Sequence, residues 1–159
     1  MFWLIFLSND GAFRQVFGYP GDGINGAIEA LRRRRDIVQF VRVRHEEAAA
    51  FAACSYAKFT GHLGVCSPTP GPGAIHLLNG LYAAMADQTP ALAITGLQSS
   101  DVIGTHIQQD FDTVRLIGEV APYSGTVMQP ADNENMPNLA VRYALANRGV
   151  SHIGIPIDV

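Results

Sequence analysis

The chain of 159 residues is 48% hydrophobic and carries a formal net charge of -3 at pH 7. This length fits one domain, and the charge excludes an overall basic field for long contacts with nucleic acid. Two cysteines, Cys54 and Cys66, are too few for a disulfide framework and lack metal-binding spacing, so we expect a reduced, cytoplasmic protein. The apolar start of the chain is too short for a membrane span and lacks the positive region of a signal peptide.

Short β-rich runs alternate with longer stretches of helical period, a rhythm typical of βαβ units around a parallel sheet. The expected strands cover residues 15–19, 37–43, 63–67, 91–95, 124–128 and 152–157. The expected helices cover residues 23–34, 46–59, 74–85 and 139–147. The polar run 95–115 is expected to form a loop over the carboxyl edge of the sheet, where open parallel sheets bind ligands.

Two segments stand apart from this pattern. Residues 1–14, MFWLIFLSNDGAFR, show little helical patterning and are expected to precede the domain, which we place at 15–159. The arginine run 32–35 closes the first expected helix, where cations offset the helix dipole, so we interpret it as a solvated face. We therefore expect no nucleic-acid partner.

The segment VFGYPGDGING contains a GxGxxG pattern at Gly21, Gly23 and Gly26, between an expected strand and an expected helix. This context favours a dinucleotide site. Against it, Pro20 stiffens the entry to the turn, and Asp22 places a carboxylate where a pyrophosphate needs amide donors. A dinucleotide-binding oxidoreductase domain stays open as an alternative.

The segment RHEEAAAFAACSYAKFTG places Glu46 in the first turn of the second expected helix, beside an apolar wall at 48–51. Taken alone, an acid in a first turn usually does no more than complement the helix dipole. Whether Glu46 has a catalytic role therefore has to be judged from the neighbouring motifs.

The segment SPTPGPGAIHLLNGLY combines a flexible turn with a helix. Gly71, Pro72 and Gly73 let the backbone approach a ligand closely, and His76 and Asn79 lie three residues apart on one helical face. No GK[ST] follows, so the turn is not a Walker phosphate loop. A lone histidine on such a helix is more often structural than catalytic.

Six ordered blocks resemble the pyrimidine-binding domain of thiamine diphosphate enzymes: YPGDGIN, RHEEAAAFAA with SYAKFTG, GPGAIHLLNGLY, ALAITG, GTHIQQDFD and NRGVSHIGIPIDV. The resemblance covers residues 15–159 and is strongest to the pyruvate oxidase and quinone-linked pyruvate dehydrogenase branch. Acetolactate synthases are also similar, but they carry HEQ and GPGATN where this chain has HEE and GPGAIH. The implied fold is a three-layer α/β sandwich with a mostly parallel six-stranded sheet.

The resemblance also implies the site. Glu46 corresponds to the family glutamate that hydrogen-bonds a pyrimidine nitrogen and favours the imino tautomer, which removes the thiazolium proton. The implied cofactor-binding residues are Pro20, Gly21, Glu46, Thr69, Gly71, Pro72, Gly73 and Asn79. Gln109 and His76 are expected in the pocket for the substrate, which is pyruvate or a similar 2-oxo acid undergoing oxidative decarboxylation.

Two departures from the family pattern affect these expectations. Where the family reads TSGPG, this chain has Pro70 between Thr69 and Gly71, which stiffens the loop. The Gly21-Asp22-Gly23 run resembles the start of the family's magnesium and diphosphate motif, but its later asparagine is missing. No metal ligand is therefore assigned in this chain.

In the family a separate domain holds the diphosphate and magnesium, this branch also uses FAD, and the active site forms between subunits. The resemblance thus implies three partners: a diphosphate-binding domain or subunit of the same enzyme, further copies in a homo-oligomer (dimer or tetramer), and a small 2-oxo acid. We expect no turnover from the isolated chain. An acetolactate synthase-like domain and a non-catalytic assembly module stay open as alternatives.

Overall fold

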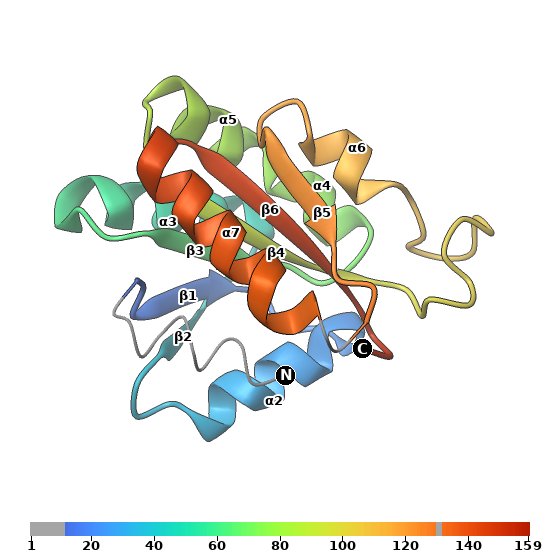
Figure 1. The fold of residues 1–159 in the computed structure, drawn as a ribbon. Helices are drawn as coiled ribbons and strands as arrows, with labels where there is room; N and C mark the ends of the chain where they lie inside the picture. Colours follow the sequence, from blue (N-terminus) through green and yellow to red (C-terminus); the bar gives the residue numbers. More distant parts are fainter. Residues whose placement is uncertain (1–11, 130–131) are drawn as a thin grey trace.

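The computed structural model describes residues 12–129 and 132–159, in which six strands form one parallel sheet (Figure 1). Their spatial order is β2-β1-β3-β4-β6-β5. The strands are β1 (Gln15–Gly18), β2 (Gln39–Arg42), β3 (Gly64–Ser67), β4 (Ala91–Leu97), β5 (Tyr123–Thr126) and β6 (Val150–Pro156).

The middle of the sheet is the most deeply buried part. Strands β4 and β6 pair over seven residues each, from Ala91 opposite Val150 to Leu97 opposite Pro156. Every residue of β3 and β6 is buried, and only Leu97 of β4 is partly exposed. Continuous apolar strands of this kind are what a parallel sheet covered on both faces requires.

Helices cover both faces, which completes the expected three-layer α/β sandwich. The 3-10 turn η1 (Asp22–Ile24) and helices α2 (Asn25–Arg33) and α7 (Asp132–Asn147) lie on one face. The opposite face carries α3 (Glu46–Thr60), α4 (Pro72–His76), α5 (Leu78–Ala86) and α6 (Thr113–Ile117). Figure 1 shows α7 crossing in front of β4 and β6, with α3 and α5 behind the sheet.

Each face has its own hydrophobic core. On the α2 and α7 side, Leu31 and Val141 pack with the strand residues Val65, Leu92 and Ile153. On the other side, small residues of α3 and the larger side chains of α5 pack against β1, β3 and β4; these include Ala49, Ala53, Leu77, Leu81, Phe17, Cys66 and Ala93. Both cysteines are buried and free.

Three helices differ from the expectation. The helix expected at 74–85 is broken at Leu77 into α4 and α5. Helix α7 begins at Asp132 and not at residue 139, and it includes Pro137, which reads in sequence as a helix breaker. Helix α6 begins within the run 95–115 that was expected as a loop and extends two residues beyond it. It has only five residues, too few for a periodic signal, and Asp112 caps it by accepting from the Arg115 amide at 2.9 Å.

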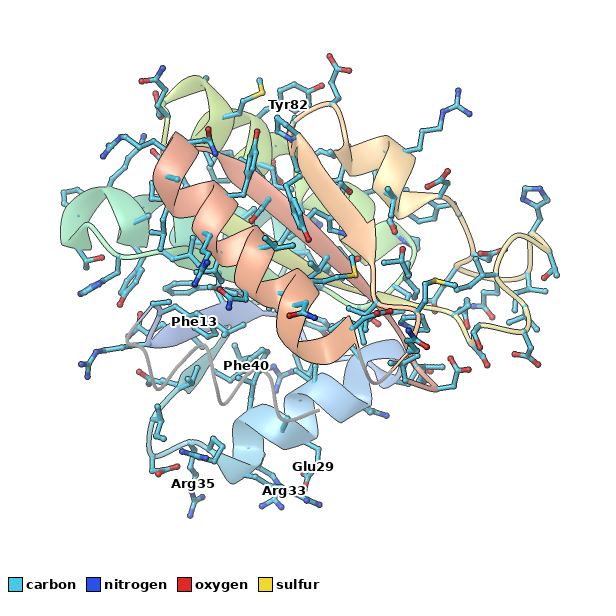
Figure 2. All side chains as sticks on the ribbon, viewed as in Figure 1. Phe13, Glu29, Arg33, Arg35, Phe40 and Tyr82 are labelled. Atoms are coloured by element: carbon cyan, nitrogen blue, oxygen red, sulfur yellow. The ribbon has the colours of Figure 1, made fainter. Side chains whose placement is uncertain are left out.

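The start of the described chain joins the core. Of the expected atypical segment 1–14, residues 1–11 lie outside the described residues. Phe13 is fully buried, and Phe40 packs against the same core (Figure 2). Within residues 12–129 and 132–159, no helix combines the length and apolar character needed to cross a membrane.

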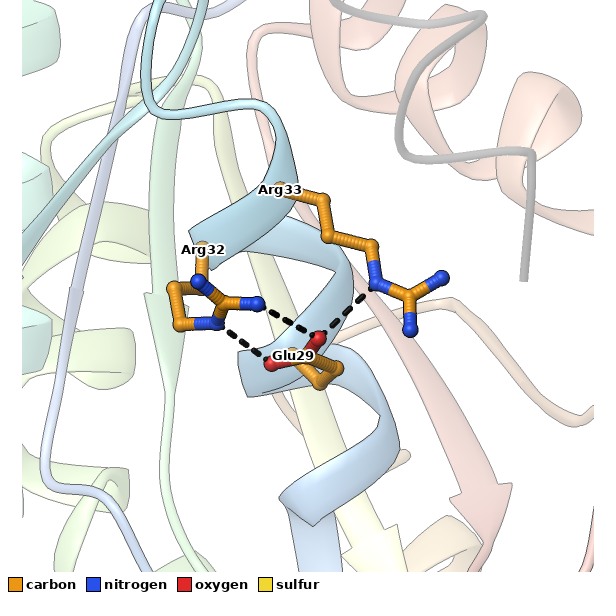
Figure 3. A network of polar contacts seen from close by, with 3 residues as sticks. All are labelled: Glu29, Arg32 and Arg33. Carbon is orange, nitrogen blue, oxygen red and sulfur yellow. Dashed lines mark hydrogen bonds and ion pairs between the residues drawn. The ribbon is translucent and has the colours of Figure 1, made fainter.

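Two arginines of the run at the end of α2 share one acidic partner. Both oxygens of Glu29 accept hydrogen bonds from Arg32, at 2.6 and 2.9 Å, and one also accepts from Arg33 at 2.8 Å (Figure 3). These bonds hold the pKa of Glu29 at about 2. Figure 2 shows Glu29, Arg33 and Arg35 at the outer end of the helix, away from the sheet.

Candidate functional site

The strand order places a topological switch point between β1 and β3, and we call this place the crevice. These strands are neighbours, but the chain leaves β1 for α2 on one face and leaves β3 for α4 on the other. Ligands of open parallel sheets bind at such a switch point, outside the carboxyl ends of the strands. The loops that follow β1 and β3 touch there, because a Cβ atom added to Gly21 would lie 2.3 Å from Thr69 Oγ1.

Glu46 lies beside this crevice, at the first residue of α3. His45 caps the helix, since its Nδ1 accepts from the Glu47 amide at 3.3 Å. Glu46 is only 8% exposed, although a first-turn acid that merely complements the helix dipole needs no burial. Burial thus distinguishes Glu46 from its neighbour Glu47, whose side chain is 39% exposed.

The apolar wall beside Glu46 is smaller than expected. Ala49 and Ala50, one turn further along α3, are buried, but Phe51 is 43% exposed. Five positions along an α-helix correspond to a rotation of about 140°, so Phe51 projects from a different face than Glu46. Phe51 is therefore not part of a buried wall, unlike Ala49 and Ala50 of the expected range 48–51.

The turn after β3 reaches the carboxyl group from the other side. Gly71 has φ of 71°, a conformation that favours glycine, and Pro72 follows as the first residue of α4. A Cβ atom on Gly73 would lie 3.1 Å from Glu46 Oε1 and 3.0 Å from Thr69 Cγ2. The missing side chain at Gly73 thus keeps this oxygen accessible.

His76 contacts Glu46 directly. A hydrogen bond of 3.1 Å joins its Nδ1 to Glu46 Oε2, and its ring lies 4.4 Å from the ring of His45. Within residues 12–129 and 132–159, Glu46 Oε1 makes no hydrogen bond. One oxygen of the buried carboxyl is thus fixed, while the other is free to meet a ligand.

Asn79 lies near the start of α5, three residues after His76, but contacts a different acid. Its Nδ2 donates to Glu47 Oε1 at 2.6 Å, and its side chain is exposed. The next residue, Gly80, allows α5 to approach α3 closely, because an added Cβ atom would lie 2.4 Å from Ala50 Cβ. Close helix packing therefore brings both acids of α3 near α4 and α5.

Two further expected residues lie beside the turn. A Cβ atom on Gly71 would lie 2.6 Å from Gln109 Cβ, so the loop after β4 packs onto the turn at this point. Thr69 Oγ1 is buried and has no hydrogen-bond partner in the part of the chain that the structure describes. A buried polar atom without a partner marks a place where a ligand can supply one. Gly73 and His76 thus contact Glu46 itself, whereas Gly21 contacts Thr69, Gln109 contacts Gly71, and Asn79 contacts Glu47.

The glycine-rich turn after β1 has contacts within the chain that explain its composition. The Gly23 amide donates to Asp22 Oδ1 at 2.9 Å, so this donor is already used. A Cβ atom added to Gly23 would lie 2.2 Å from Pro70 Cγ. A Cβ atom added to Gly96 would lie 2.4 Å from the carbonyl oxygen of Gly23. Close packing accounts for these glycines, which argues against a pyrophosphate bound in this turn.

A separate cavity of about 530 Å³ lies under the loop that follows β4. Its lining is mostly apolar and includes Leu97, Ile103, Phe111, Val114 and Met128. Glu46 and the turn after β3 do not line it. The polar run 95–115 indicated a loop here, but nothing in its composition indicated a cavity.

The sequence also gave no sign of a buried polar group within the sheet. His152 is fully buried, and its Nε2 and Nδ1 lie 2.9 Å from Thr95 Oγ1 and 2.7 Å from Ser124 Oγ. Because the Ser124 hydroxyl donates to the Val114 carbonyl at 3.3 Å, it accepts from Nδ1, which leaves Nε2 to accept from Thr95. Burial lowers the pKa of His152 to about 4, so the imidazole is neutral.

Comparisons with known proteins match most of the chain. The chain is 42% identical over 144 residues to a Bacillus subtilis protein named as thiamine pyrophosphate-containing, and 38% identical over 144 residues to a pyruvate oxidase of Lactiplantibacillus plantarum. Each alignment covers 91% of this chain. An acetolactate synthase large subunit of Cyanidium caldarium is 35% identical over 149 residues, which is 92% of this chain.

The chain spans about a quarter of these relatives, with 25%, 24% and 26% of their lengths aligned. A family model described as thiamine pyrophosphate enzyme, N-terminal TPP binding domain, matches residues 6–116. This segment contains Gly21, Glu46, Thr69 and Gly73, which meet at the crevice. The chain therefore belongs to the thiamine pyrophosphate enzymes and corresponds to their N-terminal TPP-binding domain.

Proposed function

We propose that this chain forms the pyrimidine-binding half of a thiamine diphosphate site in an enzyme that oxidatively decarboxylates pyruvate or a similar 2-oxo acid. The observation that carries the proposal is the buried Glu46 carboxyl, with Oε2 held by His76 and Oε1 facing Gly73. When bound, the cofactor supplies the carbon nucleophile that adds to the carbonyl of the substrate.

Glu46 has the central role in this proposal. Its Oε1 exchanges a hydrogen bond with a pyrimidine nitrogen, and burial strengthens that bond by keeping water away. The hydrogen bond from His76 fixes the orientation of the carboxyl before the ligand arrives, so little reorganisation is needed on binding.

The loops around Glu46 shape the rest of the pyrimidine pocket. Pro20 and Gly21 line it from the loop after β1, and the Thr69 hydroxyl, which has no partner among the described residues, offers a hydrogen bond. Gly71, Pro72 and Gly73 let the backbone come close to the ring. Asn79 acts at the edge of the pocket through Glu47.

The oxidase-like reaction is supported by His76 and by the similarity to a pyruvate oxidase. His76 belongs to the GPGAIH block, where acetolactate synthases carry GPGATN, and it contacts Glu46 itself. Gln109 is assigned to the substrate pocket, and its packing on Gly71 supports this assignment. An acetolactate synthase-like reaction is the alternative, because such an enzyme is 35% identical to this chain. The two reactions can be distinguished by their products. The acetolactate synthase-like reaction forms acetolactate, whereas the oxidase-like reaction reduces an electron acceptor.

The remaining parts of the site are assigned to partners. The diphosphate, magnesium and FAD are held by another domain or subunit of the enzyme, and the functional assembly is a homo-oligomer. The Asp22 carboxylate already caps the Gly23 amide, in keeping with a chain that leaves the diphosphate to a partner. The isolated chain then holds at most the pyrimidine end of the cofactor and has no turnover.

Co-expression tests this proposal. The chain is combined with the part of the Lactiplantibacillus pyruvate oxidase that it does not match, and pyruvate-dependent reduction of an acceptor is measured with thiamine diphosphate, magnesium and FAD. We expect activity that falls by about 100-fold or more in Glu46→Gln, the lower end for loss of a proton-transferring group. The control Glu119→Gln, which changes an exposed acid 73 residues after Glu46 in the sequence, should leave the activity unchanged.

Three outcomes would contradict the proposal. Equal activity of the complex with Glu46 and with Glu46→Gln would remove the role of this carboxyl. A complex that binds the cofactor but never turns over would favour the non-catalytic assembly module. Saturable binding of NAD by the chain, without any response to thiamine diphosphate, would instead favour the dinucleotide-binding alternative.

A further inference from the structure

Two histidines and the buried glutamate form a compact cluster at the crevice. His45 and Glu46 are adjacent at the start of α3, and His76 ends α4. One nitrogen or oxygen atom of each lies within 4.8 Å of the others. The imidazole rings of His45 and His76 lie 4.4 Å apart, with an angle of 30° between their planes.

This set of donors is the one that open zinc sites use. Two imidazoles and one carboxylate bind zinc at about 2.0–2.2 Å and leave the fourth position for water or a ligand. Donor atoms at the corners of such a tetrahedron are about 3.3–3.5 Å apart, so the His76 to Glu46 pair at 3.1 Å is already close to this spacing. To complete the tetrahedron, the ring of His45 has to move toward the other two donors. Its side chain is 52% exposed and has room to rotate.

The surroundings favour a metal held by nitrogen donors. Imidazole suits zinc, whereas magnesium prefers a shell of oxygen ligands and several waters. Glu47 adds negative charge beside the cluster, because its Oε2 lies 3.9 Å from His45 Nδ1. Binding of zinc through His45 turns this ring away from the Glu47 amide that it caps.

We propose that His45, Glu46 and His76 bind a zinc ion, and that the ion excludes the pyrimidine from the crevice. The exclusion rests on the proposed function, because it requires Glu46 to be the pyrimidine's partner. A zinc ion between Oε2 and His76 replaces the hydrogen bond that orients the carboxyl group, and this removes the arrangement in which Oε1 faces Gly73 and the pyrimidine. Zinc thus acts as an inhibitor of the assembled enzyme, and cofactor loading protects against it.

Calorimetric titration of the isolated chain with zinc chloride tests the metal site. We expect one ion per chain. Loss of a residue that hydrogen-bonds a metal ligand weakens metal binding about 10- to 100-fold. Loss of a ligand itself should weaken zinc binding by about 100-fold or more, and the variants that test this are His45→Ala, His76→Ala and Glu46→Gln. His62→Ala is the matched control, since His62 is an exposed histidine stacked on Tyr56. An unchanged affinity in His45→Ala and His76→Ala, or equal weakening in His62→Ala, would overturn the site.

Competition tests the exclusion separately. The probe is thiamine without its diphosphate, because it carries the pyrimidine and does not chelate the metal through phosphates. We expect saturating thiamine to weaken zinc binding at least tenfold. If zinc and thiamine both bind with unchanged affinity, the exclusion is wrong and the proposed function stands. If zinc binds at the cluster and thiamine does not bind at all, the proposed function fails and the metal site stands.

Discussion

The buried histidine of the central sheet makes the stability of the chain depend on pH in a specific way. His152 is fully buried and has a pKa of about 4, against 6.5 for an ordinary histidine. In the unfolded chain the imidazole takes up a proton as the pH falls below 6.5, while in the folded chain it stays neutral until about pH 4. Its contribution to stability is therefore complete above pH 6.5 and is lost as the pH falls toward 4.

The size of this loss follows from the two pKa values. Linkage gives a decrease of about 2 kcal/mol in the free energy of unfolding between pH 7 and pH 5, and about 3 kcal/mol by pH 4. His152→Gln removes the titrating group and keeps an amide that can hydrogen-bond Thr95 and Ser124. The variant should be less stable than wild type at pH 7 and should lose about 2 kcal/mol less on going to pH 5.

Urea unfolding followed by circular dichroism measures this difference. Wild type, His152→Gln and the exposed-site control His62→Gln are each unfolded at pH 7 and pH 5. The control should show the same pH dependence as wild type, because His62 is exposed. Equal losses for wild type and His152→Gln between the two pH values would refute the reasoning about burial.

Three further predictions concern close contacts and a buried thiol. Gly73→Ala should reduce thiamine affinity about tenfold or more by placing a methyl group 3.1 Å from Glu46 Oε1, with little change in stability; unchanged affinity in calorimetry would contradict this. Gly80→Ala should lower the free energy of unfolding by about 1–2 kcal/mol, because overpacking between α3 and α5 outweighs the gain in helix propensity. Gly149→Ala should not, because its added Cβ atom would meet only the Asn147 carbonyl oxygen, at an ordinary contact distance of 3.8 Å; equal stabilities of the two variants in urea would argue against the close contact at Gly80. With the other cysteine replaced by alanine, Cys66 should not react with a thiol reagent at pH 8 in the folded chain, since burial raises its pKa to about 12; rapid reaction would contradict its burial.

Much of the fold could be predicted because parallel strands leave a strong signal. The apolar runs that became β3, β4 and β6 are buried on both faces, and alternation with helical segments indicates the layers. The exceptions are local. A five-residue helix such as α6 is too short for periodicity, and α7 contains Pro137, whose usual effect is to end a helix.

The candidate site was predictable as a set of residues but not as a set of contacts. The motifs brought Glu46 and the turn at 71–73 into one expected pocket, and the strand order places them beside one crevice. Sequence spacing could not show that His76 bonds Glu46 while Asn79 bonds Glu47, because that depends on how closely α5 packs on α3. It also missed His45, whose ring lies 4.4 Å from the ring of His76 at an angle of 30°.

The central claim is that the pyrimidine of thiamine binds against Glu46 at the crevice between β1 and β3. Amide chemical shifts of the 15N-labelled chain, recorded during titration with thiamine, test this claim most directly. The account predicts that the largest changes fall at Gly21, Glu46, Gly71 and Gly73, and that Glu46→Gln abolishes them. Changes confined to the cavity under the loop after β4, or to the turn at 22–26, would contradict it.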